Sequence, residues 1–134
     1  MADIRAIRAG LVANLNTIPK LRASAELIDN PTPPIALVNL DSVEYDLAMR
    51  GGLTQYNFVI TVVVGRAAER EQQRRLDLYC QPFGELSVKV AVESNRSLSG
   101  VIQDLRVTSS GSIGSININD QTYLAAEFTV TVYA

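Results

Sequence analysis

The residue types that carry most enzymatic and metal-binding chemistry are scarce in this chain. Its 134 residues include no histidine, which removes the commonest general base and the commonest metal ligand. The single cysteine, Cys80, therefore has no histidine partner, and we expect it to be a small buried hydrophobic residue and not a nucleophile. The 14 aspartates and glutamates could in principle pair for acid–base catalysis, as carboxylates do in glycosidases, but no spacing among them selects a pair.

Two short polar segments have some features of ligand-binding loops. Gly111 and Gly114 in "SGSIGSIN" are not followed by the lysine and the helix that a phosphate-binding loop requires. The segment "NINDQT" at 117–122 is a poor match to a calcium loop and fits the turn of a β-hairpin better. The sequence thus predicts no catalytic residue, no metal site and no bound cofactor, and an enzyme is disfavoured.

Length, composition and charge indicate one globular domain over residues 1–134. Apolar residues make up 47% of the chain and charged residues 19%, which is typical of a folded protein. The net charge of −2 argues against a protein that binds nucleic acid by neutralising phosphates. A lone cysteine favours a reducing compartment, and the first residues do not form a signal peptide or a membrane span. We therefore expect folding in a cytoplasm, without sequence-specific nucleic-acid binding.

Hydrophobic periodicity predicts the elements that must position any functional side chain. Ile4, Ile7 and Leu11 recur at three- and four-residue steps, which predicts an opening helix capped by Asp3. Residues 56–65 alternate and are apolar on both faces, which favours a strand inside a sheet. The other predicted elements are a weak strand within 21–27, a strand at 35–40, a long connection at 41–55, a polar helix at 66–80, a strand at 101–111 and a closing hairpin at 115–134 that turns at Asn119 and Asp120. This order predicts an α+β domain, a mainly antiparallel sheet with helices on one face.

For two segments, the sequence alone allows two interpretations each. Val88, Val90 and Val92 alternate like a strand, whereas Ser87 resembles a helix cap, and periodicity slightly favours the strand. The closing "TYLAAEFTVTVYA" has one oily face and one face of Thr, Tyr, Ala and Glu. That second face fits a sheet wall covered by a partner or an ordinary half-exposed strand, and the sequence supports both equally.

Several stretches, taken in chain order, carry a family resemblance. They are the opening helix, the proline-rich turn into "PPIALVNL", "YNFVITVVVGRA", the helix ending "RRLDLYCQP", "SVKVAVESNRSLSG" and "TYLAAEFTVTVYA". Together they resemble the tail terminator proteins of long-tailed, siphovirus-type bacteriophages, especially those of actinobacteria. The resemblance implies a mixed sheet with two or three helices, similar to the lambdoid tail terminator, and it favours a helix at 87–94, which we adopt.

The same resemblance implies a structural virion protein. Members of this family form a ring, a hexamer, on the head-proximal end of the tail tube, stop its polymerisation and offer a surface to the head–tail connector. The implied partners are copies of the chain, the tail tube protein and the connector or stopper protein, with DNA passing through the ring. The alternatives are another tail-tube or head-completion protein and, less favoured, a small ligand-binding domain or enzyme.

A closed ring needs two different, complementary patches on each subunit. We expect these patches to be the basic helix at 66–80 and the acids of the connection at 41–55, unless both are simply solvated surfaces. The candidate interface residues are Arg66, Glu69, Arg70, Arg74 and Arg75 on the helix, and Asp41, Glu44 and Asp46 in the connection. The exposed segments expected to face the tube or the connector are 41–55 and a hairpin tip at 109–115.

Overall fold

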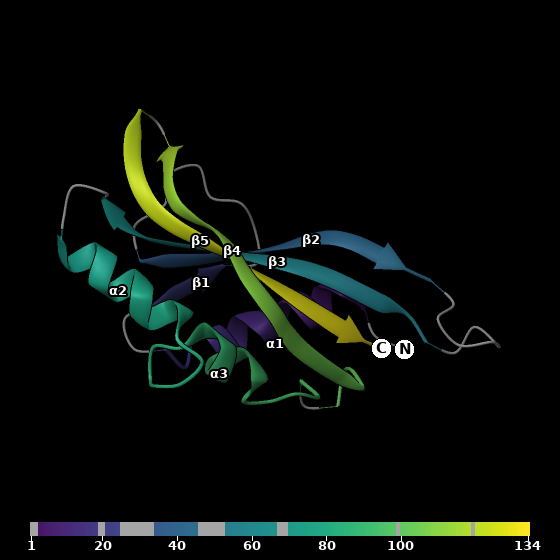
Figure 1. The fold of residues 1–134 in the computed structure, drawn as a ribbon. Helices are drawn as coiled ribbons and strands as arrows, with labels where there is room; N and C mark the ends of the chain where they lie inside the picture. The colour runs from purple at the N-terminus through teal and green to yellow at the C-terminus, as the bar shows by residue number, and fades with distance from the viewer. Residues whose placement is uncertain are drawn as a thin grey trace.

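The computed structural model describes residues 3–18, 21–24, 34–45, 53–66, 70–98, 100–118 and 120–134. The elements in chain order are α1 (Ile4–Leu15), β1 (Arg22–Ser24), β2 (Ile35–Glu44), β3 (Gln55–Arg66), α2 (Arg70–Cys80), α3 (Val88–Glu93), β4 (Asp104–Ile118) and β5 (Gln121–Tyr133). The strands form one five-stranded sheet in the order β1-β2-β3-β5-β4, and the helices lie on one side of it (Figure 1). The β1–β2 pair is parallel and the other pairs are antiparallel. The predicted α+β class, a mainly antiparallel sheet packed against helices, is confirmed.

The opening helix forms as its periodicity predicts. The Asp3 side chain accepts a hydrogen bond from the Arg5 N–H at 3.2 Å, which satisfies one of the free donors of the first turn. Ile7, Leu11 and Leu15 point toward the sheet and are fully buried. Because these residues recur at three- and four-residue steps, one stripe of α1 can cover the sheet.

The core lies between the helices and one face of the sheet, with β3 and β5 contributing many of its residues. β3 is flanked by β2 and β5, as its apolar faces predict. Phe58, Ile60 and Val62 alternate along β3 toward the helices and are 0% exposed. On β5 the predicted oily face is buried throughout; it consists of Leu124, Ala126, Phe128, Val130 and Val132.

Residues 88–93 are helical, which confirms the choice made from the family resemblance. The Ser87 Oγ accepts a hydrogen bond from the Val90 N–H at 3.2 Å and donates one to the Gln81 carbonyl at 2.6 Å. Val88 and Val92 are buried one helical turn apart, while Val90 is 45% exposed. Packing against α1 and β4 therefore outweighs the strand-like alternation of the valines.

A buried amide joins α1 to the end of α3. The Asn14 Nδ2 donates to the carbonyl oxygens of Val92 at 2.9 Å and Asn95 at 3.3 Å, and Asn14 is only 6% exposed. These two carbonyls belong to the last turn of α3 and the residues that follow it, where intrahelical donors run out. Asn14 thus caps a helix that is distant in sequence.

We expect Asn14→Ala to lower the free energy of unfolding by about 1–3 kcal/mol, because it leaves buried carbonyl groups without their donor. Urea denaturation followed by circular dichroism measures the loss. The matched control is Asn117→Ala, which removes an exposed amide from the β4–β5 hairpin and should change stability by about 0.5 kcal/mol or less. Equal losses for the two variants would contradict the role given to Asn14.

Three boundaries predicted from the sequence are wrong. Residues 41–44 continue β2 instead of starting a loop, with a register shift between Leu40 and Ser42 that places Asp41 at a bulge. Arg66 ends β3 and does not begin the helix. Residues 109–115 lie inside β4 and are not a hairpin tip. Their glycines and serines suggest a turn, but β-bulges at Val107/Ser109 and Gly111/Gly114 let the strand continue.

The predicted closing turn is in its expected place. β4 ends at Ile118 and β5 begins at Gln121, and Asp120, just before β5, lies in a turn. Asp120 has a φ of 65°, the left-handed conformation that aspartate tolerates in tight turns. Asn119 lies outside the described residues.

Candidate subunit interface

The basic helix α2 is held to the sheet by few residues. Leu76 and Tyr79 are buried against the core, and burial raises the pKa of the Tyr79 hydroxyl, with the charge of Arg75 opposing the shift. Arg70 and Arg74 are exposed on successive turns, and Arg75 is half-buried. The helix therefore presents at least two cations to solvent on one face.

The acidic candidates lie on the second half of β2. Asp41 and Glu44 are both exposed, and Glu44 is paired in register with Gln55 of β3. One side-chain hydrogen bond crosses the same pair of strands: the Asn57 Nδ2 donates to the Ser42 Oγ at 2.9 Å. Within β3 the Gln55 Nε2 donates to the Asn57 Oδ1 at 2.9 Å. Asp41 and Glu44 therefore lie on a strand that is paired with β3, and not on a loop.

The basic and acidic candidates lie at opposite ends of one protomer. β3 starts opposite Glu44 and ends at Arg66, just before α2. Its length corresponds to roughly 36 Å at about 3.3 Å per residue, and Figure 1 shows the end of β2 and α2 on opposite sides of the molecule. The two groups of charges are therefore too far apart for ion pairs within one chain. Glu69 and Asp46 lie outside the described residues, and only the backbone of Arg66 is described.

The face of the sheet opposite the helices is neither oily nor fully polar. On β5, Glu127 is exposed, Tyr123, Thr129 and Tyr133 are half-buried, and Ala125 and Thr131 are buried. A small apolar cluster of Ile35, Val63 and Ala125 lies on this face, with Leu37, Ile116 and Tyr123 against it. This mixed character is compatible with both interpretations of the closing strand.

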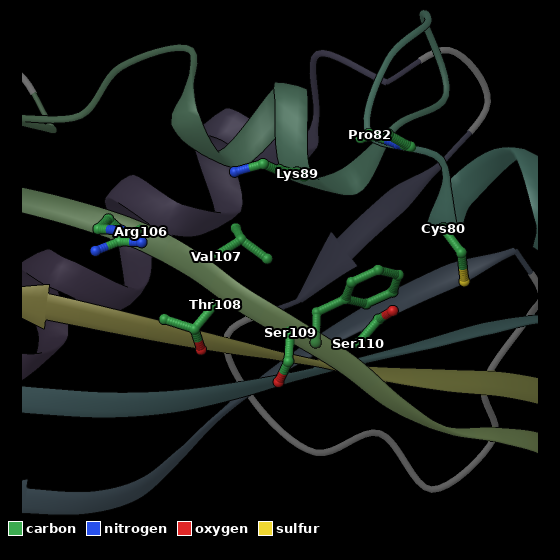
Figure 2. Close-up of a pocket in the computed structure, with 9 residues that line it drawn as sticks. Cys80, Pro82, Lys89, Arg106, Val107, Thr108, Ser109 and Ser110 are labelled. Atoms are coloured by element: carbon green, nitrogen blue, oxygen red, sulfur yellow. The ribbon is translucent and has the colours of Figure 1, made fainter.

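A third surface, which the sequence did not predict, lies along β4 at the edge of the sheet. A cavity of about 300 Å³ is lined by Cys80, Pro82, Lys89, Arg106, Val107, Thr108, Ser109, Ser110 and Phe128. We call it the β4 groove. In Figure 2, Lys89 from α3 and Arg106 from β4 lie toward one end of the groove, and Cys80 and Pro82 lie toward the other. Its lining includes two cations and no carboxylate.

A carboxylate behind the groove attaches α3 to the edge strand. The Glu93 Oε2 accepts hydrogen bonds from the Lys89 Nζ at 2.7 Å and from the Val107 N–H at 3.0 Å. Glu93 and Lys89 are four residues apart, a spacing visible in the sequence, but only the packing of α3 on β4 brings Val107 to them. The groove could therefore not be found from the sequence pattern.

The Glu93 contact predicts a pH-dependent contribution to stability. Partial desolvation raises the pKa of the Glu93 carboxyl, but hydrogen bonds from Lys89 and Val107 lower it more, so the pKa in the folded protein is below its usual value. A depressed folded pKa stabilises the protein above the unfolded pKa of about 4.3 and loses this effect as the pH falls through the folded value. Glu93→Gln should cost about 1 kcal/mol at pH 7, because the carboxylate is partly exposed, and less at pH 3, which is below the unfolded pKa.

Chemical denaturation at the two pH values measures this difference. The control is Glu85→Gln, which removes an exposed acid just before α3. A cost for Glu93→Gln that is the same at both pH values would contradict the ionic role of Glu93.

The Cys80 thiol is half-buried in the groove, and so less buried than expected. Burial raises its pKa, and the negative charge of Asp77 raises it further. Both effects keep the sulfur in the neutral thiol form at pH 7, which is a poor nucleophile.

Within the described ranges, no three cysteine, aspartate or glutamate side chains come close enough together to hold a metal ion. Likewise, none of the helices described is long and apolar enough to cross a membrane. A comparison with models of known protein families found no match, and a comparison with curated protein sequences found none either.

Proposed function

We propose that this protein is a structural component of a phage virion that forms a ring on the head-proximal end of the tail tube. The observation that carries the proposal is the placement of exposed acids on β2 and exposed arginines on α2 at opposite ends of one protomer. The resemblance of the chain to tail terminator proteins supports the same function and implies six subunits. The protein would assemble in the host cytoplasm and remain in the virion.

Complementary patches at opposite ends favour a head-to-tail contact between copies. Such a contact is heterologous, and it closes into a ring when the rotation between neighbours divides the circle evenly. In this ring Asp41 and Glu44 of one subunit would contact the α2 side of the next subunit, where Arg70 and Arg74 are the candidate partners. The charges would then select the neighbour and the register.

Termination of a tube requires only that the surface of the ring fits the end of the tube. A ring that matches the end of the tube on one side, and does not copy that surface on the other, blocks the addition of further tube subunits. Its second side can bind the connector of the head, and its bore leaves a path for DNA. This mechanism uses no catalytic residue and no cofactor.

The direct test is to add the purified protein to purified tail tubes and to image the tube ends by electron microscopy. We expect one end of each tube to carry a ring and tube growth to stop when the protein is added during polymerisation. Open-ended tubes built from the protein itself would indicate a tail-tube protein instead. Particles that lack the protein, yet have tails of normal, uniform length joined to heads, would contradict the proposal.

A further inference from the structure

We infer that the β4 groove is the site where the acidic outer edge of β2 from a second copy of the chain binds. This inference rests on the proposed ring and specifies the contact that closes it. The β2 segment concerned is Val38–Glu44, which carries Asp41 and Glu44. The contact would join the sheets of neighbouring subunits edge to edge.

The receiving edge is open in the described part of the chain. β4 is the last strand of the sheet, and only β5 pairs with it. Glu93 already occupies the Val107 N–H, so an incoming strand would meet the edge from Thr108 onward, where the bulge at Val107/Ser109 interrupts the regular ladder. Beyond this bulge, the backbone groups of an edge strand can pair with an extended segment.

The side chains of the groove favour an acidic segment. Lys89 and Arg106 line the groove and none of the described acids does, although Glu93 next to Lys89 and Asp77 near Cys80 carry negative charge close to it. The charge of Lys89 is partly balanced by Glu93, so Arg106, which is exposed, is the stronger attraction for an incoming carboxylate. Val107 and Phe128 form the apolar part of the groove lining, and Val43, half-buried between the two acids of β2, is an apolar side chain of the incoming segment that remains partly accessible.

The acidic edge of β2 is also open. Among the described residues β1 pairs with β2 only at Ile35–Leu37, so no described strand lies beside Val38–Glu44 on its outer side. β2 and β4 lie toward opposite edges of the sheet. An acidic edge on one side and a basic groove on the other allow each subunit to bind one neighbour at each edge, as a ring requires.

The basic helix ends at the groove. Cys80, the last residue of α2, lines the groove, and Arg74 is six residues earlier, roughly 9 Å along the helix axis and about 120° around it. An acid that contacts Arg74 would therefore lie beside the groove and not in it.

Two exposed serines provide a test: Ser109 lines the groove, and Ser42 lies between the two acids of β2. Both are changed to cysteine in a Cys80→Ser background, because the native thiol is half-buried and a poor nucleophile. The protein, mixed with purified tail tubes, is treated with a short bis-maleimide and run on a denaturing gel. We expect a ladder of three or more linked chains, because each subunit would link its introduced β2 thiol to the introduced groove thiol of one neighbour and its own groove thiol to the β2 thiol of the other.

Two control variants show whether the ladder arises from the proposed contact. In the same Cys80→Ser background, Ser42→Cys without Ser109→Cys should give at most linked pairs, and Ala13→Cys in place of Ser42→Cys, on the exposed side of α1, should give no ladder. A ladder with Ala13→Cys equal to that with Ser42→Cys would overturn the inference. Rings on the tubes without a Ser42→Cys ladder would overturn it while leaving the proposed function intact, and the absence of rings would overturn both.

A charge exchange tests the same contact without a cross-linker. Arg106→Glu should weaken ring assembly at least about tenfold, and adding Glu44→Arg in the same chain should restore it. Arg5→Glu, which reverses an exposed charge on α1, should leave assembly unchanged. Failure of Glu44→Arg to restore assembly would show that the acid at 44 does not face Arg106.

Discussion

Replacing Phe58 with alanine should lower the free energy of unfolding by about 3–5 kcal/mol. Phe58 is 0% exposed and lies in the middle of β3, paired in register with Leu40 on one side and Val130 on the other. Removing its ring leaves a cavity that neighbouring strands, held by their hydrogen bonds, cannot close. A domain of this kind has a total stability of about 5–15 kcal/mol, so the loss should be a large part of it.

Urea denaturation measured by circular dichroism gives the change, provided that the midpoint shifts without a change in slope. The matched control is Tyr45→Ala, because Tyr45 is an aromatic residue that is 73% exposed just after β2. We expect the control to change stability by about 0.5 kcal/mol or less. A Phe58→Ala variant as stable as the control would mean that β3 is not the centre of the core.

The parts of the fold that could be predicted from the sequence are those in which local pattern and burial agree. In α1 and in β3, the apolar residues that repeat at the helix or strand period pack into one core. Their spacing therefore predicts the type of element directly. The interior position of β3 also follows, since Val63 on its second face is 0% exposed, in the apolar cluster with Ile35. These inferences needed no knowledge of distant contacts.

Residues 87–94 show where local pattern is insufficient. Three alternating valines favour a strand, but only two of them are buried, and the helix is set by contacts from far along the chain. Asn14, 78 residues before Val92, accounts for one of these contacts. Tertiary hydrogen bonds of this kind have no signature in a single sequence.

The candidate interface was only partly predictable, because it too depends on contacts between residues that are distant in the sequence. Charge type and exposure of Arg70, Arg74, Asp41 and Glu44 follow from the sequence, because charged residues seldom lie in a core. That the acids lie on a strand and not on a loop depends on pairing with β3. The β4 groove depends on the packing of α3 against an edge strand whose two bulges look like turns in the sequence.

Reversing the charges of Arg70 and Arg74 together should weaken ring assembly by at least about tenfold, because like charges would then face the acids of the neighbouring β2. The fold should survive the change. Both side chains are exposed, and Arg70 begins α2, where an acid interacts favourably with the helix dipole.

Static light scattering in the presence of tail tubes, or the count of capped tube ends, measures assembly, and circular dichroism verifies the fold. The matched control is Arg5→Glu with Arg22→Glu, which makes the same change in net charge at exposed sites on α1 and β1. Added salt should weaken assembly of the native protein more than that of the α2 variant, because screening acts on charges that attract. Assembly by the α2 variant at the native level would exclude these arginines from the contact and leave the β4 groove as the receiving surface to be tested alone.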